Sequence, residues 1–424
     1  MAQSDIILNR LLDLQQTNFE VTDVKVKETE VVWQIEHKKE AFYICAKCGE
    51  STTSVHDKEW ITLRDIPFGG KQSIWHVKRA RILCTCTNNV RVERMDFRSQ
   101  HHFLTQRFVD HIEQVLCSKM FTVADVARLF EIDYGTVYKI DHECLLRLFQ
   151  TLPIPDPVHI AVDEKAFLKG HSYVTIVTDT EIAKVIWVAP DRTKESLDSF
   201  FKAIGPERCL KIKTVAKDLH SPYTASIKEF IPHAIEVADK FHVVQALNRA
   251  IDDCRLELSV KSKLDAGERS NIHKLNWVLR YKQDNMPNKH LESLEKLAQL
   301  NEPLYKAYLH KESFFDFFEF KPKQIKEAEN FLIRWIVEGY KISLQAFREF
   351  AGFIERNTEV LLNIIREQRT SAISEGINRK ISVIKSMAYG YKNIQYFMLK
   401  ILQRCGVLGA LYRPDRPINV HSVS

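Results

Sequence analysis

Apolar positions recur along the chain with two different periods, and the change from one to the other marks the predicted elements. Between residues 158 and 242, short runs rich in β-branched residues predict strands over 158–163, 172–178, 184–189, 212–217 and 235–238. Helical spacing predicts helices over 194–204, from Pro222 and from Phe241. We expect Ser221 to cap the second of these helices, with Pro222 as its first residue.

Helical spacing then continues from about 241 to 363 without a strand-like run, which is too long for a simple connection between two strands. We therefore predict an all-α insertion. Its Phe-rich segment 314–320 is expected to form core or interdomain contacts, and stacking on nucleic-acid bases is the alternative. Three hairpin-linked strands followed by alternating helices and strands predict that the insertion interrupts a mixed sheet of the ribonuclease-H-like kind.

A further predicted helix near the end of the chain carries a stripe of isoleucines. The stripe consists of Ile373, Ile377, Ile381 and Ile384. Off the stripe, at helical spacing from one another, lie Glu375, Asn378, Arg379 and Ser382. A helix docked by its isoleucines can direct an acidic side chain at the edge of the sheet while its basic neighbours meet phosphate.

The first hundred residues predict a small strand-rich unit after a short helix over 6–16. Residues 73–83 alternate apolar and basic side chains, as in a strand with one face toward DNA or solvent. Four cysteines have the spacing of metal ligands: Cys45, Cys48, Cys84 and Cys86. Four thiolates suit a structural Zn²⁺, and we expect loss of the zinc to unfold residues 40–100, because so small a unit has little core of its own.

Two alternatives to this zinc site remain open. The second pair is Cys-x-Cys, which strains simple knuckle geometry, so His56, His101 or His102 is a candidate to replace one thiolate. Unligated buried cysteines would also explain the pattern.

Residues 104–150 predict helices in a pattern typical of a helix-turn-helix. A helix over 121–130 with Thr122 as its N-cap is followed by a tight turn at 131–133 and a second helix that opens at Tyr134. The second helix would present Tyr134, Thr136 and Lys139 to a major groove. A helical hairpin without a DNA role fits the same pattern.

Composition and charge restrict the class of protein but do not identify its function. At 424 residues, with 45% hydrophobic and 27% charged side chains, the chain has the makings of an ordinary globular protein of two to four domains. It contains no apolar run of membrane-spanning length and no secretory signal, so we expect a cytosolic protein without a membrane partner. The net charge of +6 does not by itself imply nucleic acid, but basic residues cluster at 78–81, 91–98 and 379–392. The cysteines outside the four candidate ligands are expected to be small core residues: Cys117, Cys144, Cys209, Cys254 and Cys405.

Two aspartates end predicted strands of the mixed sheet. Asp163 closes the first strand and Asp218 the fourth, so both are expected at one edge if these strands pair. Glu164 should point to the opposite face of its strand. Taken singly, each candidate has an ordinary alternative, namely a turn or capping aspartate, or a solvated helical glutamate in the case of Glu375.

Five stretches combine these features into one pattern. They are Ala161-Val-Asp-Glu-Lys165, Asp218-Leu-His-Ser-Pro-Tyr223, 232–244, Glu375-Gly-Ile-Asn-Arg-Lys380 and Ala388-Tyr-Gly-Tyr-Lys-Asn393. In these stretches the chain resembles the bacterial insertion-sequence transposases of the ISL3 type, a branch of the DDE recombinases. The resemblance extends to the N-terminal cysteines and the helix-turn-helix and so covers nearly the whole chain. One departure is Cys84-x-Cys86, where the family usually has Cys-x-x-Cys.

The resemblance implies that Asp163, Asp218 and Glu375 are the catalytic triad and hold two Mg²⁺ (or Mn²⁺) ions. It also suggests that Asp239 and His242 form an Asp-x-x-His pair that supports the site, with a purely structural pair as the alternative. Asn378 is a further supporting residue, and Arg379, Lys380 and Lys385 are expected to contact DNA. Three carboxylates leave coordination positions open for phosphate oxygens, and they repel one another without metal, so some of their pKa values should be raised.

The leading hypothesis is thus a bacterial, cytoplasmic, nucleoid-associated transposase that binds terminal inverted repeats, then cleaves and transfers DNA strands. Its partners would be double-stranded DNA, both the inverted repeats and the target, and further copies of the chain in a dimer or higher multimer. The alternative is a catalytically silent DNA-binding regulator derived from a transposase, and the intact triad favours the enzyme.

The predicted fold is a multidomain α/β chain. A zinc-binding recognition domain (1–100) and a helix-turn-helix domain (101–152) precede the first part of the catalytic domain (158–242). The all-α insertion (243–365), the last catalytic part with the Glu375 helix (366–412) and a tail (413–424) follow.

Overall fold

The computed structural model describes residues 3–84, 86, 89–99, 103–167, 172–219, 222–261, 272, 274–276, 278–281, 286–368, 372–388, 390–408 and 411. The turn between the first two strands of the mixed sheet, the Ser221 cap, His101, His102 and the tail at 413–424 lie outside these residues. The chain divides into two compact units, residues 1–152 with 408–424, and residues 153–407.

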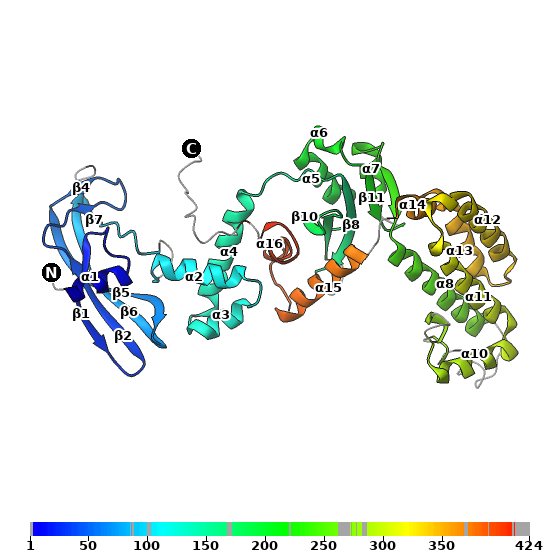
Figure 1. Ribbon diagram of the computed structural model, residues 1–424, viewed down its shortest axis with the longest axis horizontal. Helices are drawn as coiled ribbons and strands as arrows, with labels where there is room; N and C mark the ends of the chain where they lie inside the picture. Colours follow the sequence, from blue (N-terminus) through cyan, green and yellow to red (C-terminus); the bar gives the residue numbers. More distant parts are fainter. Residues whose placement is uncertain are drawn as a thin grey trace. The chain divides into compact units, whose positions relative to one another are not determined.

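The first unit is a sheet followed by three helices (Figure 1). Helix α1 (Gln3–Leu11) precedes the strands β1 (Phe19–Val26), β2 (Glu30–His37), β3 (Tyr43–Ile44), β4 (Ser51–Thr52), β5 (Val55–Phe68), β6 (Lys71–Cys84) and β7 (Asn89–Val92). The helices are α2 (Gln106–Cys117), α3 (Val123–Phe130) and α4 (Tyr134–Gln150). The first helix ends earlier than predicted, shortly before Asp13, whose left-handed backbone (φ 56) is incompatible with a continuing helix.

The sheet of the first unit has the order β1-β2-β6-β5, with β7 added to β6, and β3 and β4 form a separate hairpin. Its core is built on fully buried Trp75 together with Trp33, Leu63 and Phe19. The candidate zinc ligands Cys45 and Cys84 belong to a different, smaller cluster with Tyr43, Ala80 and Ile82. The expectation that this unit has little core beyond its metal site is therefore wrong.

The helices of the first unit are joined to this sheet by two arginines. The Arg64 guanidinium, from β5, donates to the carbonyl oxygens of Phe130 (2.8 Å) and Glu131 (2.6 Å), which end α3. Arg107, from α2, pairs with the buried carboxylate of Asp65 on β5. The carbonyls at a helix C-terminus lack partners within the helix, so Arg64 satisfies backbone groups that would otherwise be unpaired.

The second unit contains a mixed sheet, covering helices and a helical insertion (Figure 1). The sheet region comprises β8 (His159–Ala166), β9 (Tyr173–Asp179), β10 (Lys184–Pro190), α5 (Lys194–Ile204), α6 (Pro206–Cys209), β11 (Thr214–Lys217), α7 (Thr224–Phe230) and β12 (Ile235–Ala238). The next helices are α8 (Lys240–Lys261), η1 (Val278–Arg280), α10 (Asn288–Leu300), α11 (Glu302–Ser313), η3 (Phe314–Glu319), η4 (Pro322–Gln324), α12 (Ile325–Lys341), α13 (Gln345–Arg356) and α14 (Thr358–Glu367). The last two are α15 (Ala372–Met387) and α16 (Ile394–Cys405).

The strands of the second unit are ordered β10-β9-β8-β11-β12. β8, β9 and β10 are antiparallel neighbours, whereas β8, β11 and β12 run parallel. Helix α5 has the predicted bounds, but β8 continues past Asp163 because β9 pairs with it as far as Ala166. The helix expected to start at Pro222 begins instead at Thr224, after a turn at Pro222 and Tyr223.

Helices cover the mixed sheet, and the helices of the insertion form a second hydrophobic core. One core cluster unites Ile160 and Val162 of β8 with apolar residues of α5 and α7. Helix α15 contacts β8, and α16 contacts β10. From α8 to α14 every element in the described part of the insertion is helical, and Phe314 and Phe317 are fully buried there. Within the described residues, no helix is long and apolar enough to cross a membrane.

Candidate active site

Asp163 lies within β8 and is held by three neighbours. The backbone N–H of Glu164 donates to its Oδ1 (2.7 Å), and the Asn378 amide of α15 donates to its Oδ2. The third neighbour is the His242 imidazole, whose Nε2 lies 3.7 Å from Oδ1. The carboxylate is therefore fixed between a strand, helix α8 and helix α15.

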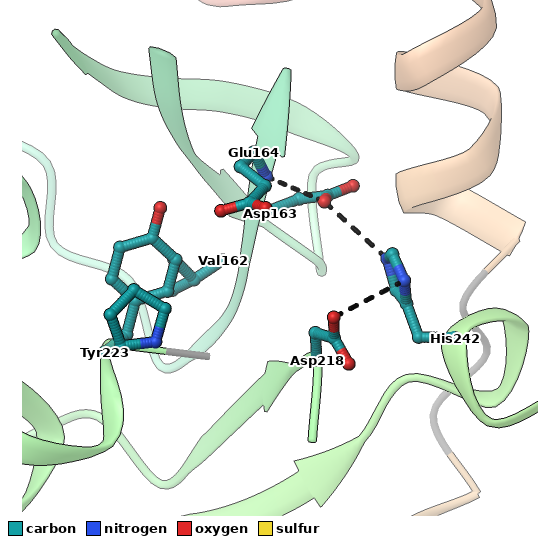
Figure 2. Close-up of a pocket in the computed structure, with 7 residues that line it drawn as sticks. Val162, Asp163, Glu164, Asp218, Tyr223 and His242 are labelled. Atoms are coloured by element: carbon teal, nitrogen blue, oxygen red, sulfur yellow. Dashed lines mark hydrogen bonds and ion pairs between the residues drawn. The ribbon is translucent and has the colours of Figure 1, made fainter. Parts of the chain in front are cut away.

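Asp218 follows β11 directly and faces the same imidazole. β11 pairs in parallel with β8, with Ala216 opposite Ala161, so two further residues bring Asp218 level with Asp163. The His242 Nδ1 atom lies 3.8 Å from Asp218 Oδ2 (Figure 2). Asp163, Asp218 and His242 line one pocket together with Val162, Glu164, Pro222 and Tyr223. The expected neighbouring strands are confirmed, although Asp163 does not end its strand.

The contacts of Asp163 shift its pKa and that of His242 in a direction that the sequence did not predict. Burial would raise the pKa of Asp163, but the contacts with His242, Asn378 and the Glu164 backbone outweigh it and lower that pKa. In turn, the Asp163 carboxylate raises the pKa of His242 to about 9 against the opposing effect of burial. Mutual repulsion was expected to raise carboxyl pKa values; for Asp163 the imidazolium reverses this.

Glu375 does not line the pocket, and its helix reaches the site through Asn378. Three isoleucines of the predicted stripe, Ile377, Ile381 and Ile384, are buried and dock helix α15, whereas the fourth, Ile373, is half-buried. Asn378, one turn after Glu375, contacts Asp163, while the Glu375 carboxylate pairs with Arg379 (2.7 Å) and the Glu375 side chain is 44% exposed. The structure thus brings the Glu375 helix to Asp163 and leaves the carboxylate itself accessible.

Asp239 and His242 have different partners. The Asp239 Oδ1 atom accepts the Phe241 N–H (2.8 Å) at the start of α8, which is the position of a helix-capping carboxylate. The His242 ring, one turn later, lies between Asp163 and Asp218. The sequence identified both residues, but it did not show that Asp239 caps α8 while His242 contacts the two aspartates.

The four N-terminal cysteines come together where the β3–β4 turn meets the end of β6. The sulfur atoms of Cys45, Cys48 and Cys84 all lie within 4.8 Å of one another, and that of Cys86 is 2.9 Å from Cys84 Sγ. Cys45 and Cys48 lie in the β3–β4 turn, where Gly49 takes the left-handed backbone (φ 76) that the turn requires. His56 hydrogen-bonds to Asp57 (3.0 Å) and is exposed.

The chemistry of this cluster suits a cation. The Glu50 backbone favours the Cys48 thiolate, but the neighbouring thiols raise the Cys48 pKa to about 12. Clustered thiols resist ionisation unless a positive ion balances the charge, and sulfur ligands at these separations fit tetrahedral Zn²⁺.

Two family models match the chain. A DDE transposase model of the ISL3 type, described as "Transposase", matches residues 160–401, and a zinc-finger of transposase IS204/IS1001/IS1096/IS1165 matches residues 43–86. The chain is 31% identical over 363 residues to the transposase for insertion sequence element IS1001 of Bordetella parapertussis, covering 84% of this chain and 87% of that one. It is 26% identical over 408 residues to the transposase for IS1557 of Mycobacterium tuberculosis, covering 88% and 87%.

The chain belongs to the ISL3 family of DDE transposases. The matched segments contain the whole mixed sheet from Ile160 onward and all four clustered cysteines. Membership of this family implies a DNA partner and the use of divalent metal ions. The match also agrees with the resemblance that the sequence motifs indicated.

The residues predicted to contact DNA lie on helices α4 and α15 of this transposase, and they differ in exposure. Thr122 caps α3 through a capping box with Asp125, and Asp133 caps α4. Tyr134 and Lys139 are exposed on α4, and Thr136 is half-buried. Arg379 and Lys380 are exposed on α15, but the Lys385 ammonium donates to the Ala166 carbonyl oxygen (3.0 Å) and so helps dock the helix onto β8.

We expect the charge of His242 to stabilise this metal-free transposase in a pH-dependent way. Its pKa is raised in the folded chain, so the contribution is fully present below about pH 6.5, the unfolded pKa, and is lost as pH rises through about 9. The denaturant midpoint of the wild type should exceed that of His242→Gln at pH 6, and the gap should shrink at pH 10. A gap that widens toward pH 10 would contradict the assigned contact with Asp163.

Proposed function

We propose that the chain is a transposase that binds the terminal inverted repeats of an insertion sequence and performs metal-dependent strand cleavage and strand transfer at Asp163, Asp218 and Glu375. One observation carries the assignment of these residues. Two carboxylates from neighbouring parallel strands converge on one imidazole, and the helix of the third is anchored to the first through Asn378.

We also propose a ribonuclease-H-like fold for the second unit. The order β10-β9-β8-β11-β12, with three antiparallel and then two parallel strands, supports a ribonuclease-H-like sheet. We place its two parts at 158–242 and 366–412, separated by the all-α insertion at 243–365. The same proposal includes a recognition domain at 1–100 and a helix-turn-helix at 101–152, supported by the capped helices α3 and α4.

The candidate triad fits hard divalent cations. Carboxylate oxygens are the ligands that Mg²⁺ and Mn²⁺ prefer, and the lowered pKa of Asp163 keeps its carboxylate ionised at neutral pH. Bound at Asp163, Asp218 and Glu375, two such ions would supply Lewis-acid activation of the attacking hydroxyl and neutralisation of the leaving oxygen. The four clustered cysteines are the proposed ligands of a structural Zn²⁺.

Three side chains around the candidate triad orient its carboxylates or balance their charge. Asn378 fixes the orientation of the Asp163 carboxylate, so that its position does not depend on solvent. His242 places a positive charge between two carboxylates that would otherwise repel each other. Arg379 holds Glu375 by an exposed ion pair, which is weak enough to exchange for another partner.

Recognition of specific DNA is assigned to the first unit. Tyr134, Thr136 and Lys139 lie in the first two turns of α4, the part of a recognition helix that meets base edges. The Arg64 contacts to the end of α3 tie this helical pair to the sheet that also carries the cysteine cluster. Self-association into a dimer or higher multimer on DNA is part of the proposal, since two element ends must be processed together.

A cleavage assay tests the proposal. The substrate is a duplex that spans one end of the encoding element and its flank, and the purified full chain is added with Mg²⁺, with Mn²⁺ or with neither. We expect a specific nick or break at the element boundary with either ion and none without added ion. Site-specific binding without cleavage under any ion would instead support the silent regulator, and a duplex of unrelated sequence serves as the control.

A further inference from the structure

Arg192 lies beside the candidate site on a loop that the fold holds rigidly. It follows β10 and immediately precedes Thr193, the N-cap of α5. Its guanidinium stacks over the Tyr173 ring, with the carbon 4.0 Å from the ring centroid, and its Nη1 lies 3.2 Å from Glu164 Oε1. The partner carboxylate is thus the residue that follows Asp163.

The backbone that carries Arg192 is tied to the neighbouring strand. The N–H of Asp191 donates to the Tyr173 carbonyl oxygen (2.9 Å), and the Asp191 carbonyl accepts the Thr175 hydroxyl (2.8 Å). The Thr175 Oγ1 atom also lies 2.7 Å from the hydroxyl of buried Tyr223, which lines the pocket. These contacts preorganise the loop, so little conformational freedom is lost when its arginine binds a ligand.

Glu164 connects this arginine to the pocket. Asp163 and Glu164 point to opposite faces of β8, as the alternation of strand side chains predicts: Asp163 meets Asn378 and His242, whereas Glu164 meets Arg192. Figure 2 shows Glu164 on the Tyr223 side of the pocket and His242 on the other. Glu164 lines the pocket nevertheless, so Arg192 is one ion pair away from the place where a DNA strand would lie.

We propose that Arg192 binds a backbone phosphate of the DNA strand that enters the site, and that Glu164 holds the guanidinium ready and releases it to that phosphate. The proposal rests on the proposed function, because it needs a DNA strand at Asp163. It adds a positioning residue on the Tyr223 side of β8, outside the triad and its helix.

The chemistry of the pair favours such an exchange. The Arg192 side chain is 47% exposed and that of Glu164 34%, and ion pairs at such exposure contribute little to stability. A guanidinium has five N–H donors, and a phosphate accepts two of them side by side. Stacking on Tyr173 fixes the plane of the group without using those donors. By contrast, the Arg107 pair with buried Asp65 is structural, because that carboxylate is 1% exposed.

The test measures DNA affinity and its salt dependence in four variants. The full chain is titrated by fluorescence anisotropy against a labelled duplex that spans the element end and its flank, at 50 to 200 mM KCl without added divalent ion. We expect Arg192→Gln to weaken binding by up to about tenfold and to reduce the slope of log affinity against log salt by about 0.9, the value of one phosphate contact. Glu164→Gln should strengthen binding and leave the slope unchanged, because it removes the competing carboxylate.

The matched control is the exposed pair of Lys211 with Asp156 (2.7 Å). These residues precede β11 and β8 and so lie at the opposite ends of the strands from the pocket. Lys211→Gln and Asp156→Asn change the net charge as the test variants do and should shift neither affinity nor slope.

If Arg192→Gln lowers the DNA affinity and Glu164→Gln raises it, the arginine contacts a phosphate. A purely structural ion pair would not give opposite changes in affinity. If both Arg192→Gln and Glu164→Gln bind DNA like the wild type, or if both weaken it equally together with the thermal midpoint, the inference is wrong. A wild-type chain that neither binds nor cleaves the duplex would instead reject the proposed function itself.

Discussion

Asp163→Asn should lower DNA strand cleavage by about a thousandfold or more, because in the proposed mechanism metal-ion catalysis supplies several kcal/mol that depend on this carboxylate. Binding of the element ends should persist, since the exchange is nearly isosteric and removes a negative charge beside the DNA. The Asp163 carboxylate accepts from both Asn378 and the Glu164 N–H, whereas an amide has one oxygen and must turn its NH₂ toward one of these donors. We therefore expect a small loss of stability alongside the large loss of rate.

The measurement is the single-turnover cleavage rate together with end-binding affinity, and Glu375→Gln should behave in the same way. Asp179→Asn is the matched control: this aspartate ends β9 and accepts the Glu181 N–H (2.8 Å), which an asparagine can also accept. Its cleavage rate should match the wild type. Parallel loss of cleavage, binding and thermal midpoint in Asp163→Asn would point to a folding role for Asp163 and against the triad.

The sequence was most informative where local chemistry decides the structure. The bounds of α5 and of β12 were predicted residue for residue, because apolar periodicity and capping residues are local. The end of β8 was not, since Asp163, Glu164 and Lys165 are polar and were taken to end the strand. Their backbones nevertheless pair with Ile176, Thr175 and Val174 of β9. A backbone ladder does not depend on side-chain polarity, and an open pocket lets these side chains remain polar within a strand.

Sequence spacing could not predict the contacts between distant segments of the chain that build the site. Spacing placed Asn378 and Lys385 on the helix of Glu375, but not their use of Asp163 and the Ala166 carbonyl as partners. His242 was recognised as supporting, yet only the parallel pairing of β8 with β11 puts both aspartates around its ring. Arg192 belongs to none of the motifs, because its position depends on how the loop after β10 folds back over Tyr173.

The zinc cluster is separate from the main core of the first unit, and this separation predicts how far unfolding extends when the metal is removed. Zinc sites contribute on the order of 10 kcal/mol of binding free energy in small peptides, all of it folding free energy for the segments they join. Here those segments are the β3–β4 hairpin and the β6–β7 connection, whereas Trp75, Trp33 and Leu63 pack without the cysteines. The loss should therefore be local rather than extend over residues 40–100.

We expect Cys48→Ser, or chelation of the wild type, to reduce zinc content from one ion per chain toward zero and to unfold the β3–β4 hairpin and strand β7. Hydrogen exchange should become fast there, while the amides of β1, β2 and the first half of β6 keep their protection, since the Trp75 core remains buried. Affinity for the element ends should fall, because we propose that this unit takes part in recognising them. Asp163, where we propose that cleavage takes place, lies in the other compact unit, so metal-dependent cleavage should survive on a pre-bound, high-concentration substrate.

Cys117→Ser supplies the control, because it makes the same chemical change in the first unit at a half-buried cysteine outside the cluster. Its zinc content and hairpin protection should equal those of the wild type. Two results would count against the zinc site: a metal-free chain whose hairpin amides stay protected, or equal zinc loss in both variants. Exchange that spreads across β1 and β2 would show instead that the Trp75 core depends on the metal, contrary to the packing of the two clusters.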